Sequence, residues 1–152
     1  MYEPIRTKSV HTMADVPADF PHRSREEELD IQLAGHLAAL LAVTDELRAL
    51  GAGSDLDAAA DRLAREVARL RGGTPPVRST APAVADHHVH ALHARAHALA
   101  GRALVVAASR ADTGAAILAA ERMDAHAAEG ARSPAPEAEA AADAARELTG
   151  AH

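Results

Sequence analysis

Residues 24–50 read SREEELDIQLAGHLAALLAVTDELRAL, and this stretch decides the fold class. Ser24 precedes three glutamates, and Glu27 stands three positions after it, which is the capping-box pattern of a helix N-terminus. Apolar residues then recur at alternating steps of four and three, as on the packed face of a helix. This seam consists of Leu29, Leu33, His36, Leu40, Val43, Leu47 and Leu50. We therefore predict a long helix that ends at Gly51 and Gly53.

Three later segments show the same helical periodicity. The first covers about residues 54–72 and ends at a pair of glycines. A proline-rich linker, residues 73–83, separates it from a longer segment at about 84–110. A short break then leads into a last, shorter segment that ends near Gly130. The predicted order of helices is therefore long, short, long, short.

These segments predict an all-α fold. Tight turns make each long helix and the short helix after it an antiparallel hairpin, over residues 24–72 and 84–130, and two such hairpins pack as a four-helix bundle. Residues 1–23 contain three prolines and predict an extended arm. Residues 131–152 are rich in alanine and glutamate and have few large apolar side chains, so they predict a flexible or partly helical tail.

The composition restricts the classes of function. Alanine accounts for 41 of the 152 residues, which favours helices, and the absence of cysteine excludes thiolate and disulfide chemistry. The formal net charge of -6 disfavours binding to nucleic acid. No apolar run approaches the ~18 residues of a membrane span, and no signal-peptide pattern occurs. We expect a soluble, cytoplasmic protein that does not associate with membranes.

Histidines cluster in the third helical segment. They are His87, His88, His90, His93 and His97, and Asp86 precedes them. At about 100° per residue, His90, His93 and His97 share one stripe of the helix with Asp86. His93 and His97 are four residues apart, a spacing that lets two imidazoles bind one metal ion. A solvated polar face and a pH-sensitive contact are the alternative interpretations of this stripe.

The last helical segment supplies further candidate ligands for the same metal site. Antiparallel pairing of the third and fourth helices places Asp124 and His126 near the level of His97. Because these two residues point to opposite sides of their helix, only one of them can join the site. A site without cysteine uses nitrogen and oxygen ligands, which suit zinc, nickel, cobalt or copper(II) rather than copper(I).

A separate expectation concerns His36, which stands in the apolar seam of the first helix. We predict that His36 is a buried polar residue. In that position it either forms a hydrogen bond with a neighbour such as Glu66 or sets the register of the packed helices.

No nucleophile motif, phosphate-binding loop or cofactor fingerprint occurs in the sequence. We therefore expect a helical-bundle protein that acts by protein–protein interaction and has no catalytic activity. The short helices leave part of the long seams uncovered, which favours a homodimer. The alternative is a transition-metal-binding bundle protein that uses the histidine stripe. A small enzyme with its site near His36 is a third interpretation.

Overall fold

The structure is a computed structural model, and it describes residues 23–78, 88–132 and 136–150. Over these ranges it contains five α-helices and no strand, which confirms the all-α prediction. The helices are α2 (Arg25–Ala49), α3 (Leu56–Leu70), α4 (Val89–Arg110), α5 (Thr113–Arg132) and α6 (Pro136–Gly150).

Parts of two predicted segments lie outside the described residues. The arm predicted for residues 1–23 is described only at Arg23, and the linker predicted for residues 73–83 is described only as far as Arg78. Asp86, a candidate metal ligand, also lies outside, as does His87. The described members of the histidine stripe are therefore His90, His93 and His97.

Helix α2 begins where the sequence places its cap. The Ser24 hydroxyl accepts a hydrogen bond from the Glu27 amide at 3.1 Å, and the Ser24 amide donates to the Glu27 carboxylate at 3.1 Å, so the predicted capping box is confirmed. At the other end Gly51 has φ +67°, in the left-handed region that glycine adopts without strain. Local sequence signals thus define both ends of this helix.

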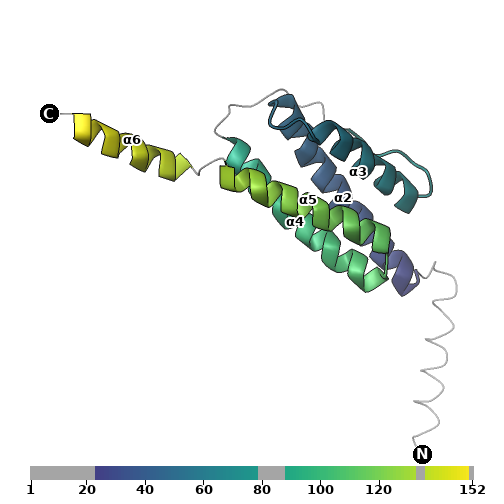
Figure 1. The fold of residues 1–152 in the computed structure, drawn as a ribbon. Helices are drawn as coiled ribbons and strands as arrows, with labels where there is room; N and C mark the ends of the chain where they lie inside the picture. Colours follow the sequence, from purple (N-terminus) through teal and green to yellow (C-terminus); the bar gives the residue numbers. More distant parts are fainter. Residues whose placement is uncertain (1–22, 79–87, 133–135, 151–152) are drawn as a thin grey trace, which may run out of the picture.

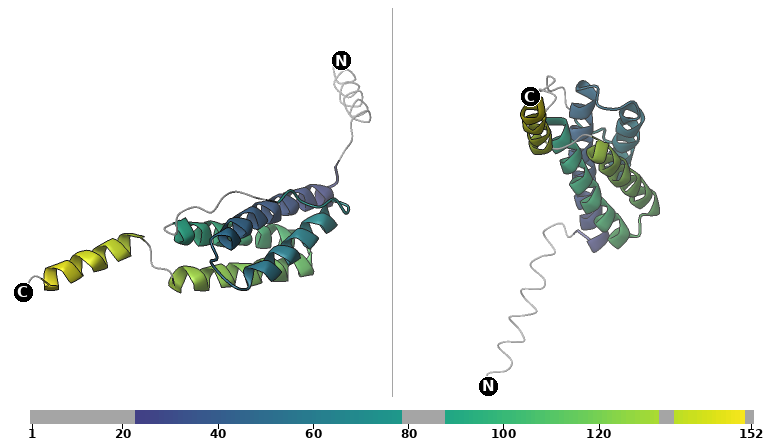
Figure 2. Two further views of the ribbon diagram at one scale, coloured as in Figure 1. Left: turned by 90° about the horizontal axis from the view of Figure 1, so that it is seen from above. Right: turned by 60° about the vertical axis from the view of Figure 1, so that its left-hand side comes forward.

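Helix α2 has two neighbours. It packs against α3 and against α4, while α4 packs against α5 (Figures 1 and 2). Most of the larger core side chains come from α2 and α3, and they are Leu33, Leu37, Leu40, Leu41, Val43, Leu47, Leu56, Leu63 and Val67. Helices α4 and α5 contribute mainly alanines to the core, which are Ala96, Ala100, Ala103, Ala107, Ala115 and Ala119. Short side chains allow close approach of the helices, and the packing is compatible with a bundle.

Ion pairs join α3 to α5, which otherwise touch only slightly. Arg62 donates to Glu121 at 2.7 Å, and Arg69, near the end of α3, pairs with Asp112, just before α5. Arg122 pairs with Asp55 at the start of α3. Exposed ion pairs contribute about 0–1 kcal/mol each. Apolar packing on α2 therefore holds α3 in place more than these pairs do.

The described lengths of the last two helices are similar. Helix α5 has 20 residues against 22 in α4, and the predicted start of the third helix, near residue 84, lies outside the described residues. The sequence suggested a stop near Gly130, but a glycine costs only about 1 kcal/mol in a helix, and α5 continues to Arg132. Because α5 is almost as long as α4, short helices do not explain a dimer at this pair.

Helix α6 lies in residues 131–152, the segment that the sequence predicts to be flexible or partly helical. Pro136 is its first residue, where the missing amide hydrogen carries no penalty. Every residue from Ala141 to Gly150 is exposed, and α6 extends away from the other helices (Figures 1 and 2). Within the described ranges, no helix is both long and apolar enough to cross a membrane.

Candidate functional site

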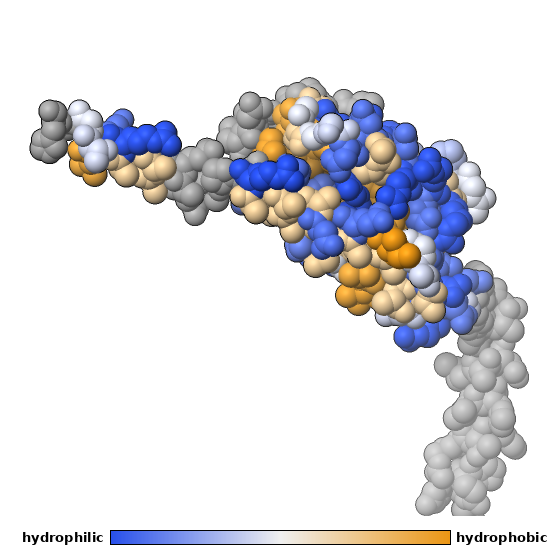
Figure 3. Space-filling view, in the orientation of Figure 1, coloured by the Kyte–Doolittle hydropathy of each residue, from blue (hydrophilic) through white to orange (hydrophobic). Residues whose placement is uncertain are grey.

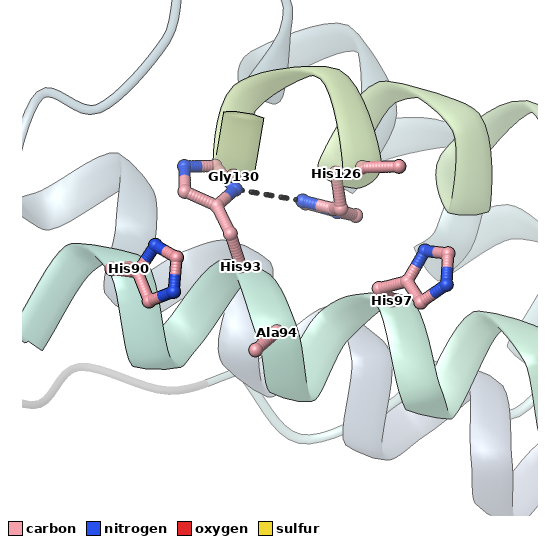
Figure 4. Close-up of a pocket in the computed structure, with 7 residues that line it drawn as sticks. His90, His93, Ala94, His97, His126 and Gly130 are labelled. Atoms are coloured by element: carbon pink, nitrogen blue, oxygen red, sulfur yellow. Dashed lines mark hydrogen bonds between the residues drawn. The ribbon is translucent and has the colours of Figure 1, made fainter. Parts of the chain in front are cut away.

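Four of the predicted site residues meet in one pocket between α4 and α5. His90, His93 and His97 come from α4, and His126 comes from α5 (Figure 4). The pocket has a volume of about 300 Å³, and its remaining lining residues are Ala94, Ala127 and Gly130. Because the other lining residues are so small, the imidazole rings define the chemistry of this space.

The closest contact in the pocket joins His93 and His126. Their Nδ1 atoms are 3.0 Å apart, with ring centroids at 5.3 Å and an angle of 45° between the ring planes. The two residues are 1% and 2% exposed. Only one Nδ1 can carry the shared proton, so one ring donates and the other accepts. The Nε2 atom of His126 is buried and has no hydrogen-bond partner among the described residues.

Helix periodicity explains the burial of this pair. His93 stands three residues before Ala96 and seven before Ala100, on the face of α4 that carries the buried alanines. His126 stands seven residues after Ala119 on the buried face of α5. Both rings therefore enter the interior from opposite helices and meet there.

A third histidine, His97, is held by a hydrogen bond to the backbone of α5. The Nδ1 of His97 lies 3.0 Å from the carbonyl oxygen of Met123. A carbonyl only accepts, so Nδ1 carries the hydrogen in this bond and Nε2 keeps its lone pair. His97 and His90 are both half-buried.

The surroundings keep the central pair uncharged. The pKa of His126 is lowered to about 4, mainly by burial, with contributions from repulsion by His93 and Arg122 and an opposing effect of Asp55. Burial is also the main cause that lowers the pKa of His93, against an opposing effect of Glu129. Both rings are therefore neutral at neutral pH, which is the form of imidazole that binds metal ions.

Arg122 is a buried residue that the sequence analysis did not single out. Its Nη2 donates to Asp55 at 3.0 Å, whereas its Nε and Nη1 have no partner in the part of the chain that the structure describes. It lies four residues before His126, on the same face of α5. The spacing of four residues from His126 was the signal in the sequence for the burial of Arg122, but an arginine in an alanine-rich helix is normally exposed.

Arg122 allows a prediction about stability. Arg122→Met replaces a buried cation with an apolar chain of similar length, so the free energy of unfolding should stay equal or rise. Asp55→Ala keeps the buried cation and removes its partner, and this should cost about 1–2 kcal/mol. Urea denaturation at pH 7 measures both values. A larger loss in Arg122→Met than in Asp55→Ala would show that the guanidinium stabilises the fold.

The other predicted ligands do not join the pocket. Asp124 is exposed and is not among the residues that line it. Across the described ranges, no group of three or more His, Cys, Asp or Glu side chains is arranged to hold a metal ion. The structure thus brings the four histidines to one pocket, but only His93 and His126 are in direct contact.

The prediction that His36 is buried is wrong. His36 is half-buried, whereas Leu37, Leu41 and Thr44, which lie outside the predicted seam, are fully buried. Helix α2 packs against two helices, so its buried face is broad and centred toward Leu37 and Leu41. At about 100° per residue, His36 falls at the edge of that face. The buried polar histidines are His93 and His126 instead.

Comparisons of the chain with protein-family models, with curated proteins and with solved structures find no match in any of the three. The residues and geometry described above are therefore the basis for inferring a function.

Proposed function

We propose that this protein acts by protein–protein interaction and forms a homodimer through the outer surface of α4 and α5, without catalytic activity. In this proposal α2 to α5 form a four-helix bundle of two antiparallel hairpins, which serves as a rigid support for the interface. One observation carries the proposal: two large aliphatic side chains are exposed on neighbouring helices. Val105 on α4 is 66% exposed, and Ile117 on α5 is 53% exposed.

The two side chains lie at the same level of the helix pair. Val105 is six residues before Ala111, where the chain turns, and Ile117 is six residues after it. Their chain neighbours Leu104 and Ala116 are only partly buried against the core. We call Leu104, Val105, Ala116 and Ile117 the Val105–Ile117 patch. Apolar colour gathers over the same end of α4 and α5 in Figure 3.

The physical reason for an interface is the cost of leaving this patch in water. Burying a valine or an isoleucine side chain is worth about 1.5–3 kcal/mol. Exposed apolar side chains that gather on one part of a surface mark an interaction site more often than scattered ones do. A two-fold interface uses the same patch on both copies, so the dimer buries the exposed side chains of both patches.

Sedimentation equilibrium at micromolar concentrations tests the proposal. The wild-type chain should sediment at twice its mass of 15.7 kDa. Val105→Glu and Ile117→Glu should each shift the protein to the monomer, because each places two carboxylates in an apolar interface. Val77→Glu is the matched control, since Val77 is 96% exposed outside the helices, and it should leave the dimer intact. A wild-type mass of 15.7 kDa throughout would refute the dimer.

A further inference from the structure

The histidine pocket is separate from the Val105–Ile117 patch. The patch lies near the turn between α4 and α5, whereas the pocket lies toward the start of α4 and the end of α5. The pocket is therefore a feature that dimer formation does not explain. Its central contact is the pair of buried Nδ1 atoms of His93 and His126, 3.0 Å apart.

This separation is close to that of two ligands on one metal ion. Zinc–nitrogen bonds of about 2.0–2.1 Å in a tetrahedral site place the two nitrogens about 3.3 Å apart. To admit an ion the pair must open by a few tenths of an ångström, and both rings must turn so that their Nδ1 lone pairs point to the ion instead of to each other. The ring that donates the shared proton then carries its hydrogen on Nε2, so binding to the neutral pair releases no net proton.

The composition of the pocket selects the class of ion. Among the described residues that line it, the only polar side chains are imidazoles, and none is a carboxylate. Nitrogen ligands suit zinc, cobalt, nickel and copper(II), whereas calcium and magnesium require oxygen.

His97 provides a route to a third ligand. Its Nδ1–H donates to the Met123 carbonyl, which leaves the lone pair on Nε2. His97 also stands one helical turn after His93 and lines the same pocket.

The pair also carries one buried ring nitrogen that has no partner among the described residues. Buried polar atoms in folded proteins nearly always have partners. The Nε2 of His126 has none in the described chain, although the ring is only 2% exposed. A bound water or ion in the pocket is one explanation for an atom of this kind.

We propose that His93 and His126 bind one divalent transition-metal ion in the pocket between α4 and α5. His97 becomes the third ligand by a rotation of its side chain that gives up the hydrogen bond to Met123, and water completes the coordination. The ion joins two helices, so its binding also stabilises the folded state.

Titration of the full chain with Co²⁺ at pH 7.5, followed by visible absorbance, tests this site. The wild type should bind one ion per chain and develop the intense bands of four-coordinate cobalt. His93→Gln and His126→Gln should each weaken binding on the order of tenfold or more. His97→Gln should weaken it less. His36→Gln is the matched control, since it removes a half-buried histidine from α2, and it should bind like the wild type.

Two further measurements do not depend on the folding of the pocket variants. In the wild type, substoichiometric Cu²⁺ should broaden the methyl signals of Ala94 and Ala127, which line the pocket, and leave that of Ala58 on α3 unchanged. Val105→Glu should bind Co²⁺ like the wild type even if it is monomeric, which separates this site from the dimer. Equal affinity in wild type, His93→Gln and His126→Gln, or equal broadening of all three methyls, would overturn the proposal.

Discussion

Acidification from pH 7 to pH 4.5 should lower the free energy of unfolding by about 2–3 kcal/mol through His126 alone. The pKa of this residue is about 4 in the folded chain, against about 6.5 in an unfolded chain. Below pH 6.5 the unfolded state therefore binds a proton that the folded state does not. The stability is fully present above pH 6.5 and is lost as the pH falls toward 4. The lowered pKa of His93 acts in the same direction.

Variants identify the residue responsible for this acid loss. His126→Leu removes the group, so its free energy of unfolding should fall less between pH 7 and pH 4.5. The same variant should be less stable than the wild type at pH 7, because the Nδ1 of His93 loses its partner. His36→Leu should keep the acid loss of the wild type. Urea denaturation at several pH values gives these slopes, and a full acid loss in His126→Leu would refute the assignment.

Leu33→Asp should prevent the chain from folding. Leu33 is 0% exposed in the core of α2, and a buried carboxylate without a partner costs several kcal/mol. A domain of this size has a total stability of about 5–15 kcal/mol. The variant should lose its helical circular dichroism and its cooperative thermal transition.

Ile31→Asp is the matched control for this substitution. Ile31 lies two residues before Leu33 on the same helix but is 49% exposed, so its carboxylate stays in water. Its thermal transition should remain cooperative and close to that of the wild type. A cooperative transition in Leu33→Asp at the wild-type temperature would show that this part of α2 does not pack in the core.

Local signals in the sequence determined the helix class and several helix ends. The capping box at Ser24 and the glycine at position 51 were predicted because each acts within a few residues of the chain. The alternating seam also identified core positions such as Leu33, Leu40 and Leu47, which are fully buried. Large apolar side chains that recur at helical spacing are most stable in the core, so their burial follows from periodicity.

The orientation of the alanine-rich helices depended on the tertiary structure. Apolar spacing in the third helix favours a seam through Leu92, Ala96, Leu99, Ala103 and Val106. Ala96, Leu99 and Ala103 are buried, but Leu92 and Val106 are only half-buried, and His93, Ala100 and Ala107 are buried as well. The alanines of this helix lie on all of its sides, so apolar periodicity hardly distinguishes one face from another. The positions of α2 and α5 decide which face of α4 is buried.

The burial of individual histidines also depended on the tertiary structure. From the sequence, His36 was placed in the core and His93 on a polar stripe, and the structure reverses their burial. Spacing along one helix places residues on a common face, but it does not say which neighbour covers that face. Helix α5 covers His93 and brings His126 to it from 33 residues away in the chain. The sequence by itself determined that the histidines share a stripe, and only the packing of α5 on α4 made two of them a buried pair.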